Sequence, residues 1–207
     1  MIGSLERKYV FLTPAKTGAT GWRSWLAEHC NGIQINNAHS WQVPIEYRQC
    51  TPYLSVRNPY DRCISLWWYS CADPAREKKC HLYGCSFVKY MHRLMWFRDH
   101  PDEGHAVPFA YMSLAQYGDR VEKQMGKQPN AIHLESWEAD VASFGLATEQ
   151  ETTGYRAKNT STTRPPVSPY KFLSGLEEEL VWQYCQEDFH RFGYARLPRE
   201  MGGLRRW

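Results

Sequence analysis

The sequence predicts an α/β domain on a mainly parallel β-sheet. Short strand-like runs alternate with amphipathic helical segments, which is the pattern of strands joined by crossover helices. The chain has 207 residues, of which 43% are hydrophobic and 23% charged, so it can bury a core without a disulfide framework or a structural metal. We therefore expect one domain over residues 1–207, with a surface excursion around residues 70–85.

Four short runs are typical of β-strands, because they are rich in aliphatic, aromatic or β-branched residues and are too short for helices. They cover residues 8–13, 33–35, 53–56 and 131–134. Ligands of such sheets bind beyond the carboxyl ends of the strands. The segments that follow these runs are therefore the first places to look for a site.

Five segments carry helical periodicity or capping signals. The helix after the third strand has a well-marked start, because Asn58 is a good N-cap, Pro59 fits the first helical position and Asp61 places a carboxylate in the first turn. A capping box of Ser174 and Glu177 marks the start of the last helix. The five helices are expected to begin near residues 20, 58, 86, 136 and 174.

Two longer segments carry no assigned helix or strand. Residues 100–126 are only weakly patterned, although they contain many aromatic side chains. Residues 154–169 are rich in Thr, Ser, Arg and Pro, which is typical of a long loop.

The charge and hydropathy patterns exclude several classes of protein. A formal net charge of +3 is too small for a nucleic-acid-binding surface, so we expect no nucleic-acid partner. No run approaches the roughly 18 apolar residues of a membrane span, and the charged residues 6–8 stand where a signal peptide has its apolar stretch. We expect a soluble, cytoplasmic protein, although a luminal catalytic domain trimmed of its anchor would have the same sequence properties.

The cysteines favour reduced thiols, because their number is odd and their spacing resembles no small secreted scaffold. One cluster, formed by Cys71, Cys80, His81 and Cys85, offers four potential zinc ligands. The adjacent Cys80 and His81 and the lack of a CxxC pair make the spacing poor for zinc. Ordinary thiols on a connecting segment are the favoured interpretation, and a metal site is the alternative.

The segment from Pro14 to Trp22 has the composition of an anion site at the start of a helix. Its small residues let backbone N–H groups approach a ligand, its hydroxyls add donors, and its lysine adds a full charge. These residues are Lys16, Thr17, Gly18, Ala19, Thr20 and Gly21. The order differs from that of a Walker A loop, because Lys16 precedes the glycine. The alternative is an ordinary turn between a strand and a helix, with a solvated lysine.

A second candidate group follows the third strand. Arg57 stands at the carboxyl end of that strand, and Ser65 lies about two turns into the next helix. An arginine can hold a phosphate through two N–H groups, and a serine hydroxyl can complete the shell of donors. The alternative is that Arg57 is a surface ion-pair partner.

Taken together, the segments KTGATGW and RNPYDRCIS resemble the paired cofactor signatures of sulfotransferases that use 3'-phosphoadenosine 5'-phosphosulfate (PAPS). In that family the first segment holds the 5'-phosphosulfate, and the Arg and Ser of RNPxDxxxS hold the 3'-phosphate. The resemblance therefore implies that residues 16–20 hold the 5' end and that Arg57 and Ser65 hold the 3'-phosphate. The extra Ala15 between Pro14 and Lys16 departs from the commonest form of the first motif.

Further segments are similar to elements of Golgi-type and bacterial carbohydrate sulfotransferases, so the resemblance covers most of the chain. These segments are residues 85–90, 132–135, 158–161 and 187–194. The resemblance implies a P-loop-like three-layer domain, adenosine 3',5'-bisphosphate as product, and an acceptor that is a hydroxyl-bearing small molecule or glycan. It implies no metal cofactor and leaves the oligomeric state open.

Sulfuryl transfer requires a base for the acceptor hydroxyl. His39 is the first candidate, because family members often place a catalytic His or Glu just after the second strand; His133 and Glu135 are the second choices. The alternative is that His39 is an ordinary loop histidine. Many members of the family hold the 3'-phosphate with a basic residue late in the chain, and Arg164 is the candidate for this role here. Trp41 or Trp96 would line an acceptor cleft.

Two other functions compete with this interpretation. A small-molecule or nucleotide kinase is disfavoured by the missing Walker A order and by the lack of an obvious paired-acid magnesium site. A non-catalytic module that binds a nucleotide or a sulfated partner would need the two binding segments but no base. Replacement of His39 by Gln separates an enzyme from such a module, because only an enzyme would lose turnover.

Overall fold

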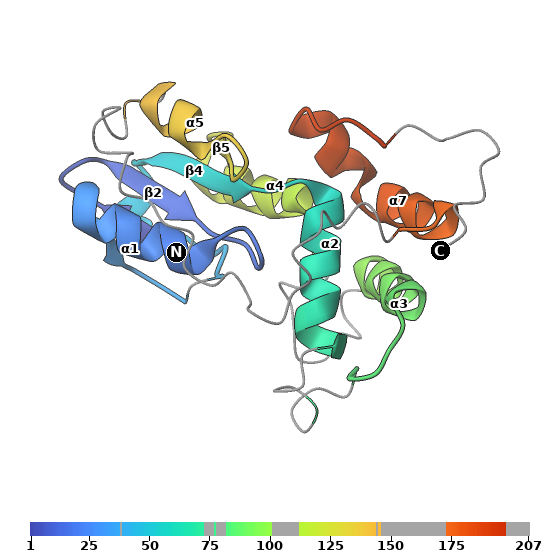
Figure 1. Ribbon diagram of the computed structural model, residues 1–207. Helices are drawn as coiled ribbons and strands as arrows, with labels where there is room; N and C mark the ends of the chain where they lie inside the picture. Colours follow the sequence, from blue (N-terminus) through green and yellow to red (C-terminus); the bar gives the residue numbers. More distant parts are fainter. Residues whose placement is uncertain are drawn as a thin grey trace.

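The computed structural model describes the chain in seven parts, namely residues 1–37, 39–72, 77, 82–100, 112–143, 145 and 173–197. They form a five-stranded β-sheet with helices around it (Figure 1). The strands are β1 (Ile2–Ser4), β2 (Tyr9–Leu12), β3 (Ile33–Gln34), β4 (Thr51–Val56) and β5 (Asn130–His133). Their order in the sheet is β3-β1-β2-β4-β5.

The α/β class is confirmed, and the expectation of a mainly parallel sheet holds in part, because the sheet is mixed. Strand β4 pairs in parallel with both β2 and β5, whereas β1 pairs antiparallel with both β2 and β3. The physical reason is the short connection between β1 and β2, since only an antiparallel pair can be joined by a few residues. Strand β1 has three residues and includes Gly3, so no run of apolar residues marks it in the sequence. It alone runs against the other four strands.

The helices agree with the five predicted starts and add one that was not predicted. They are α1 (Ala19–His29), α2 (Pro59–Trp67), α3 (Phe87–Asp99), α4 (Leu114–Met125), α5 (Trp137–Ser143) and α7 (Gly175–Arg191). Two further short elements are η1 (Ile45–Tyr47), a 3-10 turn, and η2 (Trp68–Ala72), a π-helical turn that continues α2. Of the expected surface excursion, residues 73–76 and 78–81 lie outside the described residues.

Helix α4 was missed within the weakly patterned residues 100–126. It begins with a capping box, in which the Ser113 hydroxyl accepts from Gln116 N and the Gln116 side chain accepts from Ser113 N. The buried carboxylate of Asp188, on α7, accepts the N–H groups of Leu114 and Ala115 at 3.0 and 2.8 Å. Helix α7 therefore fixes the start of α4.

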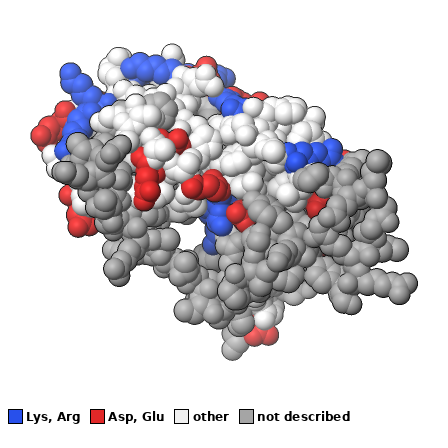
Figure 2. Space-filling model, turned by 45° about the horizontal axis from the view of Figure 1, so that its top comes forward, with Lys and Arg blue, Asp and Glu red and all other residues white. Residues whose placement is uncertain are grey.

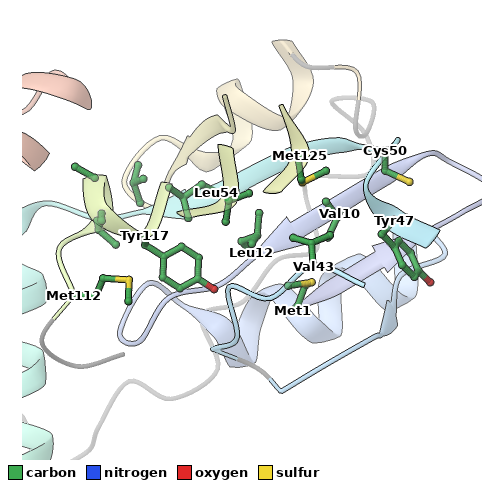
Figure 3. Packing of buried hydrophobic residues seen from close by; sticks show 14 of the residues in the cluster. Met1, Val10, Leu12, Val43, Tyr47, Cys50, Leu54, Met112, Tyr117 and Met125 are labelled. Atoms are coloured by element: carbon green, nitrogen blue, oxygen red, sulfur yellow. The ribbon is translucent and has the colours of Figure 1, made fainter. Parts of the chain in front are cut away.

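Alternate residues of the central strands face opposite sides of the sheet, as the period of a β-strand requires. On one side Leu12 and Leu54 join a buried cluster with residues of α4, among them Tyr117 (Figure 3). On the other side Phe11 packs with Trp22 of α1 and with residues of α5. A third cluster joins α2, α3 and α7 beyond the sheet, where Figure 1 shows these helices grouped together.

Candidate functional site

The carboxyl ends of β2, β4 and β5 lie at one edge of the sheet. Leu12 is paired with Leu54, Val56 is paired with His133, and Leu134 N donates to the Val56 carbonyl at 2.9 Å. The first loop, which we define as residues 13–18, therefore follows β2 at the edge where Arg57 follows β4. The structure thus brings together the two segments that the sequence singled out.

The carbonyl groups of the first loop are turned toward the protein, and each one from Thr13 to Thr17 accepts a hydrogen bond. The donors are His39 Nδ1 to Thr13 (2.8 Å), Thr17 Oγ1 to Pro14 (2.8 Å), Arg62 Nε to Ala15 (3.3 Å), Arg57 Nη1 to Lys16 (3.3 Å) and Ser55 Oγ to Thr17 (2.7 Å). Side chains from several elements therefore fix the backbone of the first loop.

The N-terminus of α1 has the properties of an anion site. Gly18 is its N-cap in a left-handed conformation, with φ 86°, and Lys16 also has a positive φ, 68°. Alternation of such conformations can turn successive N–H groups toward one point. Among the described residues, no side chain caps the helix and no acidic residue stands in its first turn. The first N–H groups of α1, at Ala19 and Thr20, lack intrahelical partners, as in every α-helix.

Gly18 is also required for packing. A Cβ atom added at Gly18 would lie 2.9 Å from Leu134 Cδ1 and 3.4 Å from Trp22 Nε1. The positive φ of Gly18 is a second reason for glycine, since it strains residues with a side chain. The residue that follows β5 thus comes close to the start of α1.

Lys16 lies beside the end of the helix that carries Ser65. The Lys16 ammonium lies 4.3 Å from the centre of the Tyr69 ring, which belongs to η2 and is 40% exposed. Ser65 precedes Tyr69 by about one helical turn and is half-buried, so the two residues lie near one side of the helix. The Asn58 side chain accepts from Tyr60 N at 3.0 Å and caps α2 directly after Arg57, as predicted.

His39 is held beside the first loop with its ring in a defined orientation. Because the Thr13 carbonyl can only accept, His39 Nδ1 is the donor of their 2.8 Å hydrogen bond, which leaves the lone pair of the neutral ring on Nε2. Burial lowers the pKa of His39; the Thr13 bond opposes this shift, and the charges of Arg23 and Lys16 add to it. A neutral imidazole near Lys16 fits the role of a general base.

The two second choices for the base use their polar atoms elsewhere. His133 Nδ1 faces Asp140 Oδ2 at 2.8 Å, and its Nε2 faces the Phe192 carbonyl at 2.9 Å. Glu135 accepts from Asn58 N at 2.8 Å and from the Tyr194 hydroxyl at 2.9 Å. Both side chains therefore join β5 to neighbouring elements.

Other predicted site residues are placed differently. Arg164 lies outside the described residues, as do Cys80 and His81. Within the described ranges, no group of three or more His, Cys, Asp or Glu side chains could hold a metal ion, and none of the six described cysteines forms a disulfide. The Trp41 ring lies under Arg120, whose guanidinium carbon is 5.0 Å from the ring centre, and Trp96 is 44% exposed on α3.

Three residues that the sequence did not single out hold the first loop. Ser55 and Trp22 share the Thr17 carbonyl, and Trp22 Nε1 donates to it at 3.1 Å. Arg62 is 1% exposed and also donates to the Met112 carbonyl at 3.0 Å. In the sequence, the signs that could have pointed to these residues were a serine, Ser55, within an apolar strand and an arginine, Arg62, on the buried side of a helix.

A cavity of about 300 Å³ lies between α3, α4 and α7. Its lining is polar and contains none of the predicted site residues; it includes Arg98, Gln116, Gln183, Tyr184, Glu187 and His190. On the face shown in Figure 2, basic and acidic side chains are interspersed among uncharged ones. In the part of the chain that the structure describes, no helix is long and apolar enough to cross a membrane.

In comparisons with protein-family models, with curated proteins and with solved structures, none matches this chain. The resemblance of the two sequence motifs and the geometry around them are therefore the basis for a function.

Proposed function

We propose that the chain is a PAPS-dependent sulfotransferase, which moves a sulfuryl group to a hydroxyl of a carbohydrate or small metabolite by in-line displacement. The observation that carries this proposal is the first loop: its carbonyls from Thr13 to Thr17 are all engaged within the protein, and it leads into a helix N-terminus that no described side chain caps. A P-loop-like three-layer arrangement belongs to the same proposal; helices on both faces of the sheet support it.

The residues present suit both ends of the cofactor. Lys16 and the N–H groups at the start of α1 supply positive charge and donors for a 5'-phosphosulfate. Arg57 carries a guanidinium at the end of β4, directly before the capped start of α2 that carries Ser65, and is the proposed partner of the 3'-phosphate. The bond from Arg57 to the Lys16 carbonyl links the two ends.

In this mechanism the chain positions the substrates, stabilises the developing charge and takes up a proton, and it forms no covalent intermediate with the sulfuryl group. PAPS supplies the sulfuryl group and leaves as adenosine 3',5'-bisphosphate. Lys16 and the helix N-terminus stabilise negative charge that develops on the leaving phosphate. His39 Nε2 accepts the proton of the acceptor hydroxyl, while the Thr13 carbonyl holds the ring. The scheme calls for no metal ion.

A thermal-shift titration with adenosine 3',5'-bisphosphate, beside ATP with magnesium, ADP and AMP, tests this proposal. A ligand that binds only the folded state stabilises it by about 2.7 kcal/mol at a hundredfold excess over Kd, which raises the midpoint by roughly 5–10 °C. We expect a selective shift with the bisphosphate, lost in Arg57→Ala and kept in the exposed control Arg93→Ala. A larger shift with ATP and magnesium would replace the proposal with a nucleotide kinase.

A further inference from the structure

The segment that carries His39, which we call the base segment (residues 39–43), is held by helix α4. The Tyr117 hydroxyl donates to the Ser40 carbonyl and lies 3.4 Å from the His39 carbonyl oxygen. The Gln124 side chain donates to the Trp41 carbonyl at 3.0 Å and accepts from Val43 N at 3.2 Å. Two side chains of α4 thus contact four backbone groups of the base segment.

These two side chains can hold the base segment together, because they lie on one face of α4. Tyr117 and Gln124 are separated by two helical turns, so both project toward the same neighbour. Gln124 donates to the Arg120 carbonyl as well, one turn earlier on α4, which restrains its amide. The base segment therefore lies along a surface that is set before any ligand arrives.

Tyr117 is the more constrained of the two. Its side chain is 1% exposed and packs among Leu12, Leu54 and Met112, and Figure 3 shows its ring extending from α4 into this cluster. Burial raises the pKa of the Tyr117 phenol, so the group stays a donor across the working range of pH. A ring fixed by packing leaves its hydroxyl little freedom to follow a displaced loop.

His39 is consequently held at two points. Its ring donates to the Thr13 carbonyl in the first loop, and the next backbone carbonyl, that of Ser40, accepts from Tyr117 in α4. If the second bond is lost, the base segment can shift while the first loop stays fixed by its other donors. Such a shift would lengthen the bond between His39 Nδ1 and the Thr13 carbonyl.

We propose that Tyr117, assisted by Gln124, is a positioning residue that keeps His39 Nε2 directed at the acceptor hydroxyl. The effect on catalysis rests on the proposed sulfuryl transfer. The fixed orientation of the His39 ring does not depend on that proposal. Loss of the Tyr117 hydroxyl lowers kcat about tenfold, the effect of about 1.4 kcal/mol in the barrier. The affinity for adenosine 3',5'-bisphosphate stays unchanged, because no bond to Arg57 or to the start of α1 is removed.

The experiment compares Tyr117→Phe and Gln124→Leu with Tyr47→Phe. Tyr47 is a matched control, because it is buried in the same cluster (Figure 3) but makes none of the bonds to the base segment. Long-range ¹H–¹⁵N spectra over a pH series report the tautomer and titration of His39 without any substrate. Bisphosphate affinity and kcat, where an acceptor has been found, are measured on the same samples.

In the parent and in Tyr47→Phe we expect His39 to carry its proton on Nδ1 and to titrate below the ordinary histidine range. In Tyr117→Phe and Gln124→Leu we expect mixed tautomers, a titration nearer the ordinary range, and lower kcat at unchanged bisphosphate affinity. Unaltered His39 signals in both variants would overturn the positioning role, whatever the activity. If the parent binds no bisphosphate while its His39 signals respond as described, the proposed function fails and the positioning role stands. Gln124→Leu decides the matter if Tyr117→Phe does not fold.

Discussion

Two neighbouring segments follow strands of the same sheet edge and are held in opposite ways. The first loop, after β2, is fixed through its backbone carbonyls, which accept from the hydroxyl of Thr17 in the loop itself and from side chains elsewhere in the chain. The segment from His133 to Glu135, at the end of β5, is fixed through its own side chains, which contact Asp140, the Phe192 carbonyl, Asn58 N and Tyr194.

This difference predicts which residues serve the proposed chemistry and which serve stability. A loop held by its backbone can present its side chain and N–H groups to a ligand, whereas a segment held by its side chains cannot release them without loss of stability. We therefore expect truncation of the Lys16 side chain to lower activity with little loss of stability. Substitutions at His133 or Glu135 should lower stability first.

The largest expected effect follows from Lys16→Ala. Loss of its charge removes stabilisation of the leaving phosphate, so we expect kcat to fall about 1000-fold or more. The free energy of unfolding falls by no more than about 1 kcal/mol, because the bond to the Lys16 carbonyl does not involve the side chain and the contact of its ammonium with the Tyr69 ring is at an exposed site. Lys8→Ala is the matched control, since Lys8 also has a positive φ, 52°, but lies at the other end of β2. A fully active Lys16→Ala protein would contradict the mechanism.

The next effect separates His39 from His133 by kinetics. In His39→Gln the amide can still donate to the Thr13 carbonyl but cannot take a proton, so we expect kcat to fall about 100-fold or more at unchanged bisphosphate affinity. Because the pKa of His39 is lowered, the neutral base is present above the folded-state value and is lost as pH falls through it. The parent's kcat/KM should therefore rise with pH and reach half of its plateau value below the ordinary pKa of histidine. If the chain were a non-catalytic binding module, neither the parent nor His39→Gln would show any turnover.

A third prediction concerns stability at His133. His133→Phe removes hydrogen bonds to Asp140 and to the Phe192 carbonyl, so the free energy of unfolding falls by about 2 kcal/mol and the midpoint by roughly 4–8 °C. Urea titration measures the change, with the exposed His92→Phe on α3 as control. If activity were abolished while the midpoint stayed constant, His133 would be the base, and the end of β5 would serve the chemistry in place of His39.

The smallest effect is expected for Glu135→Gln. An amide cannot accept from both Asn58 N and the Tyr194 hydroxyl as the carboxylate does, so about 1 kcal/mol of stability and roughly 2–4 °C are lost. Glu138→Gln on the exposed side of α5 is the control, and calorimetry gives both midpoints. An unchanged midpoint with a large loss of kcat would place Glu135 in the chemistry instead.

The elements predicted correctly have local signals. Asn58 with Pro59 and Ser174 with Glu177 mark helix starts within a few residues of sequence, and the structure has both caps. Strand β1 could not be predicted in this way, because three residues that include Gly3 become a strand only through pairing with β2 and β3. Helix α4 had a local signal in Ser113 and Gln116, but Gly118 interrupts its apolar pattern.

The candidate site was predictable only in part, because only some of its residues have local signals in the sequence. Lys16 and Arg57 stand in motifs, so the sequence alone pointed to both. Ser55 and Tyr117 act on backbone groups that are 38 to 78 residues distant in the chain, and no local pattern reveals such partners. Residue types at a site can be predicted from a motif, whereas the groups that fix their geometry come from the folded sheet and its helices.

The central claim is that an anionic nucleotide binds at the first loop and Arg57. A titration of ¹⁵N-labelled protein with adenosine 3',5'-bisphosphate, followed by backbone and arginine side-chain spectra, tests it most directly. We expect saturable shifts that are largest for the amides of residues 16–20 and for Arg57, with His133 and Glu135 little affected. Shifts centred on the cavity lined by Arg98 and His190, or no saturable shifts at all, would contradict it.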